Sequence, residues 1–561
     1  MKAGAALLGA SPVSTRLPMA AADRWLLRAC IGLPLAALIL FFGLPMLSIA
    51  WRSLMQEGGG IGLGNYLALL DTPGVWRASV NSTGLGLATT ALTVLLGFVL
   101  AYGLERTHMA GKRFVAVGMA LPMLAPSLVL GLGLIFLLGR NGLVGKLLGV
   151  RMDVYGFWGL LLANILYALP QAVLIIRAAL RHGDMRQYDA AEVLGATPWR
   201  QFVDITLPNA RYGLLSAAFV VFTITITDFG NAVVIGGNFP VLATEIYNQV
   251  SGQMKFGMGA VVGILLLTPA ALSIWIEHVA TQRQARMSGE AGQPPTPHRH
   301  LVRDLSFTVA CGTIALSVYA VVLTVVAGSF VRLWPYKFEF TLKHYNITLS
   351  DGYAPLWNSV TVSLAAALFG TSMLFMLAFA VRKYPGRLAQ LASLLSALPV
   401  GVPGLVLGLA YVFTFNSATM PWGALYGSAA LLALCNYYHY HTQGYVAMMT
   451  GMRNVPTNLE DATTVLGGGT GRILRDVYWP AIQTTLLAVG VFLFMRSMVT
   501  LSAIIFLITP AMSLGAVSVM RLDEAGFTSQ AAAFSTCIMA LVGGLSLALH
   551  ALTTRTRAAP H

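Results

Sequence analysis

The sequence predicts an all-α membrane protein with about twelve transmembrane helices arranged in two repeated halves. Composition is the first observation behind this prediction: 57% of the 561 residues are hydrophobic, 10% are charged, and the mean hydropathy is +0.72. Soluble domains carry about 25% charged residues, so this chain has too little polar surface to cover a soluble body. The second observation is that its apolar runs reach the roughly 20 residues that a bilayer-spanning helix needs. The third is an internal repeat, described below.

Twelve apolar runs are the expected spans, and helices suit them because a helix satisfies its own backbone hydrogen bonds in lipid. They lie at about 29–51, 81–103, 114–138, 156–180, 211–236, 258–280, 305–330, 358–381, 389–415, 424–449, 481–508 and 530–553. A proline-rich polar segment separates the two sets, which is typical of a linker. We therefore expect a first half over 1–280, a cytoplasmic linker over 281–304 and a second half over 305–561.

The net charge of +14 raises the alternative of nucleic-acid binding, but the placement of the charges favours membrane topology. With the N-terminus inside, 24 of the 35 Lys and Arg residues lie in cytoplasmic segments, 10 lie outside and Arg496 lies within a span. This bias satisfies the positive-inside rule and predicts that both termini are cytoplasmic. One loop is an exception, because Arg140, Lys146 and Arg151 would lie outside.

Several classes of chemistry have no support in the sequence. The four cysteines are scattered in or beside apolar runs, which predicts buried thiols rather than disulfides or a metal site. We find no catalytic arrangement of side chains. The chain has no Walker A motif, so we expect no cofactor in this chain and no enzymatic activity of its own.

The third span of each half carries the same proline-containing pattern. Leu121-Pro122, Pro126 and Leu128 to Leu132 match Leu398-Pro399, Pro403 and Leu405 to Leu409 at a constant offset of 277 residues. This internal duplication predicts two halves that point the same way, related by an axis along the membrane normal. Prolines within a span are tolerated where neighbours satisfy the freed backbone groups, so each third span is expected inside the bundle.

A polar pattern repeated between spans is the most informative feature. The two copies, each 19 residues from aspartate to proline, are Asp189-Ala190-Ala191, Gly195, Pro208 and Asp461-Ala462-Thr463, Gly467, Pro480. They fall within the polar segments 184–208 and 454–480, both expected in the cytoplasm. An ordinary amphipathic loop is the plain alternative for one copy, but identical spacing in two copies favours a docking element.

These residues resemble the cytoplasmic signature of permease subunits of binding-protein-dependent ATP-binding-cassette (ABC) importers. The family usually has glutamate where Asp189 and Asp461 stand, and the second copy departs further at Thr463 and Trp479. The resemblance covers nearly the whole chain as two fused halves and implies the type I importer-permease fold. Fused permeases of this size resemble importers of ferric iron and of 2-aminoethylphosphonate. Thr227-Asp228-Phe229-Gly230 and Ser502-Ala503-Ile504 look most like the 2-aminoethylphosphonate permeases.

The resemblance implies a mechanism and a set of partners. Each docking segment would fold as a short helix held by one of two copies of a cytoplasmic ATPase subunit, which would bind ATP and Mg²⁺. A periplasmic or extracellular substrate-binding protein would deliver the solute to this chain in a bacterial inner membrane. We further expect Asp189 and Asp461 early in each docking helix, where the helix dipole favours a carboxylate, and Pro208 and Pro480 at the turn into the next span.

The fifth spans are expected to line a pathway between the halves. They carry two charges, Asp228 and Arg496, and intramembrane charges usually face the bundle interior and have partners. Both charges could contact a zwitterionic solute, with Thr227 and Thr500 nearby; the alternatives are a structural ion pair or an interfacial Asp228. His439 and His441, two residues apart, favour a packing patch over a metal site.

The function expected from these features is ATP-driven import of 2-aminoethylphosphonate or a related phosphonate. The alternatives are import of ferric iron and, in a different class, ion-coupled secondary transport. Secondary transporters also have twelve spans and repeats, but such a function would leave the docking segments unexplained.

Overall fold

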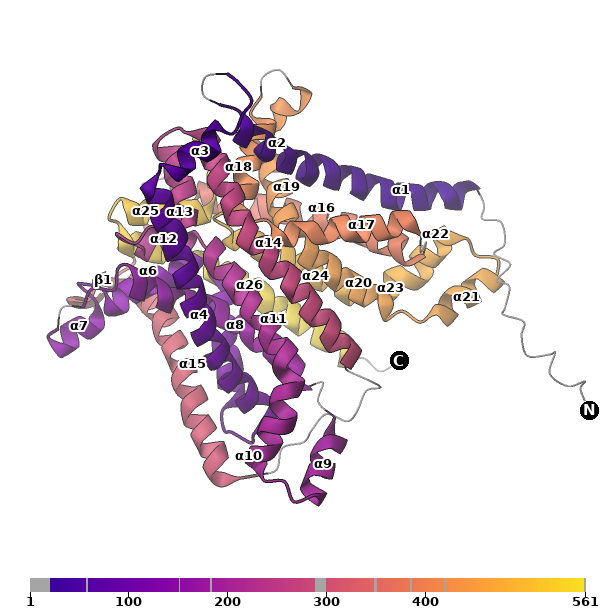
Figure 1. Cartoon of the computed structure of the whole chain (residues 1–561), viewed down its shortest axis with the longest axis horizontal. Helices are drawn as coiled ribbons and strands as arrows, with labels where there is room; N and C mark the ends of the chain where they lie inside the picture. The colour runs from indigo at the N-terminus through magenta and orange to yellow at the C-terminus, as the bar shows by residue number, and fades with distance from the viewer. Residues whose placement is uncertain are drawn as a thin grey trace, which may run out of the picture.

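The computed structural model describes residues 21–56, 59–150, 152–181, 184–287, 299–347, 351–383, 386–417 and 420–558, and most of them are helical. Figure 1 shows long helices that spread from the side of the molecule near α12 (Gly230–Ile235) and α25 (Gly515–Glu524) in two directions, one group toward α9 (Met185–Val193) and the other toward α21 (Thr457–Val465). We call the end that carries α9 and α21 the docking end. The far end carries α25 and a β-hairpin.

The first half of the chain is a succession of long helices joined by short ones. In order, its other elements are α1 (Ala21–Leu38), the π-helix η1 (Ile39–Gly43), α2 (Leu44–Leu54), α3 (Gly64–Leu70), α4 (Pro73–Arg106), α5 (Lys112–Ala120), the 3-10 helix η2 (Leu121–Leu124), α6 (Ser127–Leu138), α7 (Leu143–Leu148), α8 (Phe157–Arg181), α10 (Pro198–Gln201), the π-helix η3 (Phe202–Thr206), α11 (Leu207–Thr227), α12 (Gly230–Ile235), α13 (Leu242–Tyr247), the π-helix η4 (Asn248–Gly252) and α14 (Phe256–Met287).

The second half follows a similar order. Its other elements are α15 (Leu301–Phe330), β1 (Val331–Leu333), β2 (Lys337–Phe340), the 3-10 helix η5 (Lys343–Tyr345), α16 (Ala354–Lys383), α17 (Arg387–Ala397), the 3-10 helix η6 (Leu398–Gly401), α18 (Gly404–Phe415), the 3-10 helix η7 (Pro421–Leu425), α19 (Ala429–His439), α20 (His441–Arg453), α22 (Thr470–Arg472), the π-helix η8 (Ile473–Tyr478), α23 (Trp479–Ala481), α24 (Gln483–Val499) and α26 (Thr528–Ala558).

The structure has the predicted all-α polytopic architecture, with fewer regular spans than expected. Within the described residues, nine helices are long and apolar enough to cross a membrane, or eleven if each of two bent pairs counts as one span. The difference from twelve lies at 424–449, where α19 and α20 are separated at Tyr440. The hydroxyl of Tyr440 is paired with Thr500 Oγ1 at 2.8 Å. The counterpart in the first half, α8, is continuous.

Both third spans are interrupted at their repeated proline pairs, as the motif predicts. A 3-10 turn replaces the α-helix at Leu121–Leu124 and again at Leu398–Gly401. The second interruption bends the chain by 108° between α17 and α18. The segments after the bends are deeply buried, with Leu128 and Leu405 both at 0% exposure.

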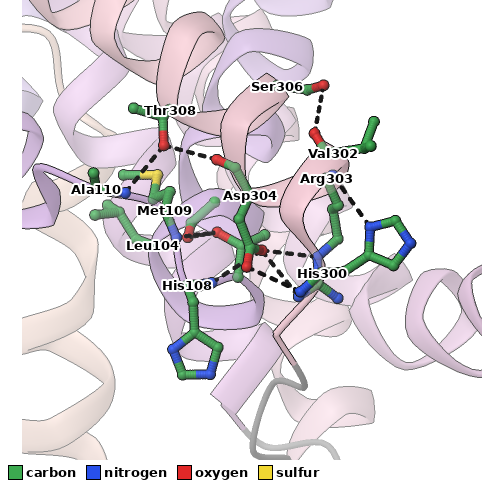
Figure 2. A network of polar contacts seen from close by, with 12 residues as sticks. Leu104, His108, Met109, Ala110, His300, Val302, Arg303, Asp304, Ser306 and Thr308 are labelled. Atoms are coloured by element: carbon green, nitrogen blue, oxygen red, sulfur yellow. Dashed lines mark hydrogen bonds and ion pairs between the residues drawn. The ribbon is translucent and has the colours of Figure 1, made fainter.

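Each half lends its first helix to the other half. The first helix, α1, packs against α16, and α15 packs against α4, α5 and α6. Figure 2 shows the start of α15, where the Asp304 carboxylate accepts hydrogen bonds from the backbone N–H groups of His108 at 3.2 Å and His300 at 3.1 Å. Ala110 N–H in the same loop donates to Thr308 Oγ1 at 3.0 Å. The two halves therefore interlock.

A small antiparallel hairpin at the far end was not expected from the sequence. It follows α15 directly, pairing Val331 with Phe340 and Leu333 with Lys337. Lys146 from α7 donates from Nζ to the Pro335 carbonyl at 2.7 Å and lies 5.3 Å from the ring centre of Tyr336.

The hairpin and its surroundings bear on the basic loop that violates the positive-inside rule. Arg140 forms an ion pair with Asp153 at 2.9 Å, and Lys146 is held by the hairpin. Hydrogen bonding from Arg140 holds the pKa of the Asp153 carboxyl below its ordinary value. Arg151 lies outside the described residues. Two of the three exceptional cations thus have local partners.

The four cysteines are free thiols; three are buried and Cys537 is half-buried. This agrees with the expectation from their scattered positions in apolar sequence.

Candidate functional site

The two repeated polar patterns fold into matching local structures. In each, a nine-residue helix ends just before a glycine in the left-handed region, with φ of +75° at Gly195 and +76° at Gly467. Gly195 N–H bonds to Glu192 O at 2.9 Å, and Gly467 N–H bonds to Thr464 O at 3.0 Å. Glycine adopts this conformation without the steric cost that other residues meet. The repeated glycine therefore has a conformational reason beyond its small size.

The position of the aspartates within these helices corrects the sequence-based expectation. Asp189 and Asp461 are each the fifth residue of a nine-residue helix, not part of the first turn. In the first helix the cap is Asp184, whose carboxylate accepts from Arg186 N–H at 3.1 Å. The expectation placed the helix start at the motif and missed the cap that precedes it.

The repeated prolines also differ from expectation in one half. Pro208 is the second residue of α11, which continues directly from the π-helix η3, so the chain does not turn there. Pro480 lies in α23, two residues before Ile482, where a bend of 71° separates the helical segment Thr470–Ala481 from α24. The π-helices before both prolines are consistent with a widened turn that accommodates the missing backbone N–H.

Each docking helix presents an exposed face at its C-terminal end. Asp189, Ala190 and Gly195 are exposed and Ala191 is half-buried; Asp461, Ala462 and Gly467 are exposed and Thr463 is half-buried. The next residues are apolar and still more open, with Leu194 86% exposed and Leu466 82% exposed. An added Cβ at either glycine meets nothing within 4 Å. Large exposed apolar side chains that cluster together typically mark an interaction surface.

A second feature is a cavity of about 210 Å³ deep between the two halves. Its polar lining comes from both halves: Ser127, Tyr167, Gln171, Thr223, Thr227, Asp228, Ser273, His439, Tyr440, Gln443, Arg496, Thr500 and Ser502. All four residues that we expected at the pathway, Thr227, Asp228, Arg496 and Thr500, lie among them. A cavity with such a lining is able to hold a small polar solute.

The two intramembrane charges face this cavity without pairing. The ion pairs within the described part of the chain do not include one between Asp228 and Arg496. Asp228 Oδ2 accepts from Asn231 N–H at 3.0 Å. The Arg496 guanidinium lies 4.8 Å from the ring centre of Tyr440. The alternative of a structural ion pair therefore does not describe this structure.

The backbone explains why these residues reach the cavity. Helix α11 ends at Thr227 and helix α24 ends at Val499, and the next residues, Asp228 and Thr500, are extended at φ −72° in both halves. The expected continuous spans 211–236 and 481–508 are therefore both broken at this level. Thr500 Oγ1 donates to Arg496 O at 2.6 Å.

Sequence reasoning missed several lining residues, above all Tyr167 and His439. Tyr167 lies in an ordinary apolar run and carries no sequence signal for this place. His439 belongs to the tyrosine- and histidine-rich cluster, which we expected to be a packing patch. That interpretation fits His441, which is buried with Nδ1 2.9 Å from Tyr437 Oη, whereas His439 lines the cavity.

The chain is similar in sequence to known transport proteins. Residues 93–286 match the family described as binding-protein-dependent transport system inner membrane component. The ferric transport system permease protein FbpB of Actinobacillus pleuropneumoniae is 26% identical over 559 residues, covering 95% of this chain and 79% of that protein. The molybdenum transport system permease protein ModB of Azotobacter vinelandii is 34% identical over 172 residues, covering 29% of this chain and 76% of that protein.

Among solved structures, a chain of a bacterial alginate ABC transporter, crystallised with an alginate-bound periplasmic protein, is 18% identical. The match covers 48% of this chain and 97% of that chain, with a TM-score of 0.41. The family is one of transport components rather than enzymes. On the family match and the relatives together, this chain belongs to the binding-protein-dependent transport system inner membrane components, the permease subunits of ABC importers.

Proposed function

We propose that this chain is the permease subunit of an ATP-driven importer of ferric iron. The observation that carries the substrate is the relationship to a ferric transport permease along 95% of the chain. The molybdenum permease relative matches 29% of the chain, so it supports the class of protein more than the substrate. Iron was the alternative substrate from sequence, and the relatives favour it over a phosphonate.

The proposed mechanism assigns one ATPase subunit to each docking helix. The exposed Val193-Leu194 and Val465-Leu466 pairs support this assignment, because each offers an apolar contact beside small residues. Closure of the ATPase pair would draw α9 and α21 together and rock one half against the other. A substrate-binding protein would deliver the solute at the far end, and the docking end would face the cytoplasm.

The cavity between the halves would hold the solute in transit. An uncomplexed trivalent cation would be repelled by the Arg496 guanidinium and attracted by the Asp228 carboxylate. Ferric iron accompanied by an oxygen-rich anion fits both charges better, because the anion can face Arg496 while the hydroxyl and carboxylate oxygens from the first half face the metal.

A second candidate, 2-aminoethylphosphonate, is favoured by the same pair of charges. This solute has a phosphonate at one end and an ammonium at the other, so Arg496 and Asp228 would each meet an opposite charge. The two residues come from different halves and line one cavity without an ion pair between them. Ion-coupled transport draws some support from Asp228 but leaves both docking helices without a role.

Uptake in cells that lack the native gene separates these substrates. Cells complemented with the chain and its neighbouring transport genes receive ⁵⁵Fe(III)-citrate or radiolabelled 2-aminoethylphosphonate. We expect complementation to restore iron uptake, and Arg496→Leu to lower it by at least fivefold at equal protein level. Restoration of phosphonate uptake alone would replace iron with the second candidate.

The ATPase requirement has its own test. We expect an ATPase subunit to co-purify with the wild-type chain and to be lost when Gly195 and Gly467 are both changed to tryptophan. Glu339→Gln, on the hairpin at the far end, is the control and should keep the partner. Iron uptake at the normal rate in cells without the ATPase would rule out this mechanism.

A further inference from the structure

The residue just before the aspartate of each docking helix points inward rather than outward. These residues are Tyr188 in α9 and Glu460 in α21; Tyr188 is half-buried and Glu460 is 8% exposed. Tyr188 Oη pairs with Thr206 Oγ1 at 2.9 Å. Glu460 Oε1 accepts a hydrogen bond from Tyr478 Oη. Each contact joins a docking helix to the helical run that leads into the fifth span.

Both partners of these contacts occupy the same place in the repeat. Thr206 lies two residues before Pro208, and Tyr478 lies two residues before Pro480. Thr206 is 4% exposed and Tyr478 is 0% exposed. The two halves therefore keep one contact between equivalent positions, although the residue type differs at both positions: Tyr188 corresponds to Glu460, and Thr206 corresponds to Tyr478.

A cation from the end of each half's second-span helix, α4 or α16, also takes part in each contact. In the first half the Arg106 guanidinium lies 5.0 Å from the ring centre of Tyr188 and donates to Leu180 O at 2.9 Å. In the second half Lys383 Nζ donates to Glu460 Oε2 at 2.5 Å.

Arg382 ties the second arrangement further. It donates from Nε to Tyr478 Oη at 3.2 Å and from Nη2 to the Val455 carbonyl at 3.0 Å. Arg106 and Arg382 thus each bind a carbonyl at or just beyond the end of the fourth-span helix. We call each set, Arg106–Tyr188–Thr206 and Lys383–Glu460–Tyr478, a docking latch.

The two docking latches join the same three elements through different chemistry. The first combines a cation–π contact with a neutral hydroxyl pair, and the second combines an ion pair with a hydrogen bond to the carboxylate. A contact that merely fills space would not need a cation from the same helix end in both halves. Both halves keep a connection among three elements: the docking helix (α9 or α21), the second-span helix (α4 or α16) and the π-helix that leads into the fifth span (η3 or η8).

We propose that Tyr188 and Glu460 are positioning residues that carry movement of each docking helix into the transmembrane helices. Through the docking latches, displacement of α9 would move the end of α4, and displacement of α21 would move the end of α16. The force-transmitting role rests on the proposed function, since it needs an ATPase at the docking helices. The connection between these helices is formed by contacts within this chain, so it does not depend on the ATPase.

In the docking latch of the second half, the Glu460 carboxylate stays charged over the physiological pH range. Burial opposes ionisation of Glu460, but hydrogen bonds from Lys383 and Tyr478 and the positive charges of Lys383 and Arg382 outweigh it and hold its pKa below the ordinary value. The stabilisation is therefore present at neutral pH and is lost only as pH falls through that lowered pKa. Neutral substitution, rather than mild acid, is the way to open this latch.

Hydrogen exchange on the purified chain tests the connection without any partner. We expect Glu460→Gln and Lys383→Met each to raise amide exchange across 457–466 by at least threefold, while α9 stays unchanged. Glu339→Gln, which breaks an exposed ion pair with Arg332 at 2.8 Å on the far-end hairpin, is the matched control. Unchanged exchange at 457–466 in both variants would overturn the docking latch.

Coupling in the reconstituted complex tests the role. Proteoliposomes with the ATPase, a binding protein and ⁵⁵Fe(III)-citrate give the ratio of iron transported to ATP hydrolysed. We expect Glu460→Gln and Tyr188→Ala to lower this ratio at least threefold while ATPase activity persists. A purely structural role would lower iron transport and ATP hydrolysis in parallel and would leave their ratio unchanged.

Transplanting one latch into the other half supplies the rescue. The triple change Lys383→Arg, Glu460→Tyr and Tyr478→Thr installs the first-half chemistry in the second half, and we expect it to recover at least half of the lost coupling. Failure of this transplant together with parallel loss of transport and hydrolysis would contradict the proposal. If the wild-type chain bound no ATPase, the proposed function would fail, and the exchange experiment would still decide the connection.

Discussion

Beside the cavity, each half packs one serine closely against one glycine, and the two residue types occupy opposite positions in the two halves. In the first half an added Cβ at Gly230 would lie 2.2 Å from Ser127 Oγ; in the second, one at Gly404 would lie 2.3 Å from Ser502 Oγ. Ser127 and Gly404 occupy the same place after the repeated prolines. Each half thus fits one serine and one glycine at this contact.

The reciprocal pair gives a prediction at the residue scale. Gly404→Ser places two serines where one fits, and overpacking of this kind costs about 1–3 kcal/mol. We expect a lower unfolding temperature in detergent, and recovery when Ser502→Gly is added, because the double variant reproduces the first-half arrangement. Unfolding monitored by intrinsic fluorescence measures both effects. Additive destabilisation in the double variant would show that the two positions do not share this space.

Asp523 in α25 gives a pH-dependent prediction. Burial, followed by the charge of Glu524, raises its pKa to about 6. Because the folded-state pKa is raised, the free energy of unfolding falls as pH rises from the unfolded value of about 4 to about 6, and the full loss persists at higher pH. We expect Asp523→Asn to stabilise the protein at pH 7–8 by about 1–2 kcal/mol, less than full conversion of the shift because the side chain is partly exposed.

Thermal unfolding between pH 4 and 8 checks this expectation. The curves of the wild type and Asp523→Asn should converge toward pH 4, separate between about pH 4 and pH 6, and keep a constant separation above about pH 6. Asp71→Asn at the exposed end of α3 is the control, and parallel curves for Asp523→Asn and the wild type would contradict the prediction.

At the scale of elements, the exchanged first helices tie each half to the other. Asp23 near the start of α1 accepts a hydrogen bond from Thr470 N–H at 2.9 Å, at the start of α22 in the second docking segment. Asp304 near the start of α15 likewise accepts a hydrogen bond from the backbone N–H of His108, in the loop between α4 and α5 (Figure 2). The two anchors differ in target, because α1 reaches the docking segment itself.

This difference leads to a prediction for α1. Thr470 is 5% exposed, so Asp23→Ala leaves a buried backbone donor without its acceptor, at a cost of about 1 kcal/mol. We expect faster amide exchange over 470–478 and little change over 198–206. Asp23→Asn keeps an acceptor and serves as the control. Equal exchange in Asp23→Ala and the wild type would mean that the anchor does not stabilise the docking end.

Across the whole molecule, the two docking helices lie at separate edges at one end of the bundle, and the hairpin lies at the other end (Figure 1). The charge bias of the sequence predicts that the docking end is cytoplasmic. Arg140 and Lys146, which oppose that bias, have local partners that reduce their weight as topology signals.

The orientation is therefore a prediction for labelling in cells. Phe340→Cys on the hairpin, where the native side chain is 76% exposed, should react with an impermeant maleimide in intact cells. Glu192→Cys in α9 should react only after permeabilisation. Three native cysteines are buried, so the background should be low. The reverse labelling pattern would overturn the topology and the proposed site of ATPase docking.

The helical class, the repeat and the place of the docking helices were predictable from sequence because each has a local signature. Apolar run length gives the spans, and identical motif spacing gives the equivalence of Gly195 and Gly467. Helix ends were harder to predict: Asp184 caps its helix five residues before the first motif residue, and Tyr440 interrupts an apolar run that looks continuous in the sequence.

By itself, then, the sequence determined a duplicated bundle of membrane helices with two polar docking segments, since hydrophobicity and motif spacing act over short stretches of chain. Tertiary structure alone decided that Asp228 and Arg496 share a cavity with Tyr167 and His439, that Lys383 meets Glu460, and that α1 crosses to the second half. Lys383 and Glu460 are 77 positions apart in the chain, and Asp228 and Arg496, which line one cavity, are 268 positions apart (496 − 228). No local pattern specifies such partners; they follow from how the helices pack.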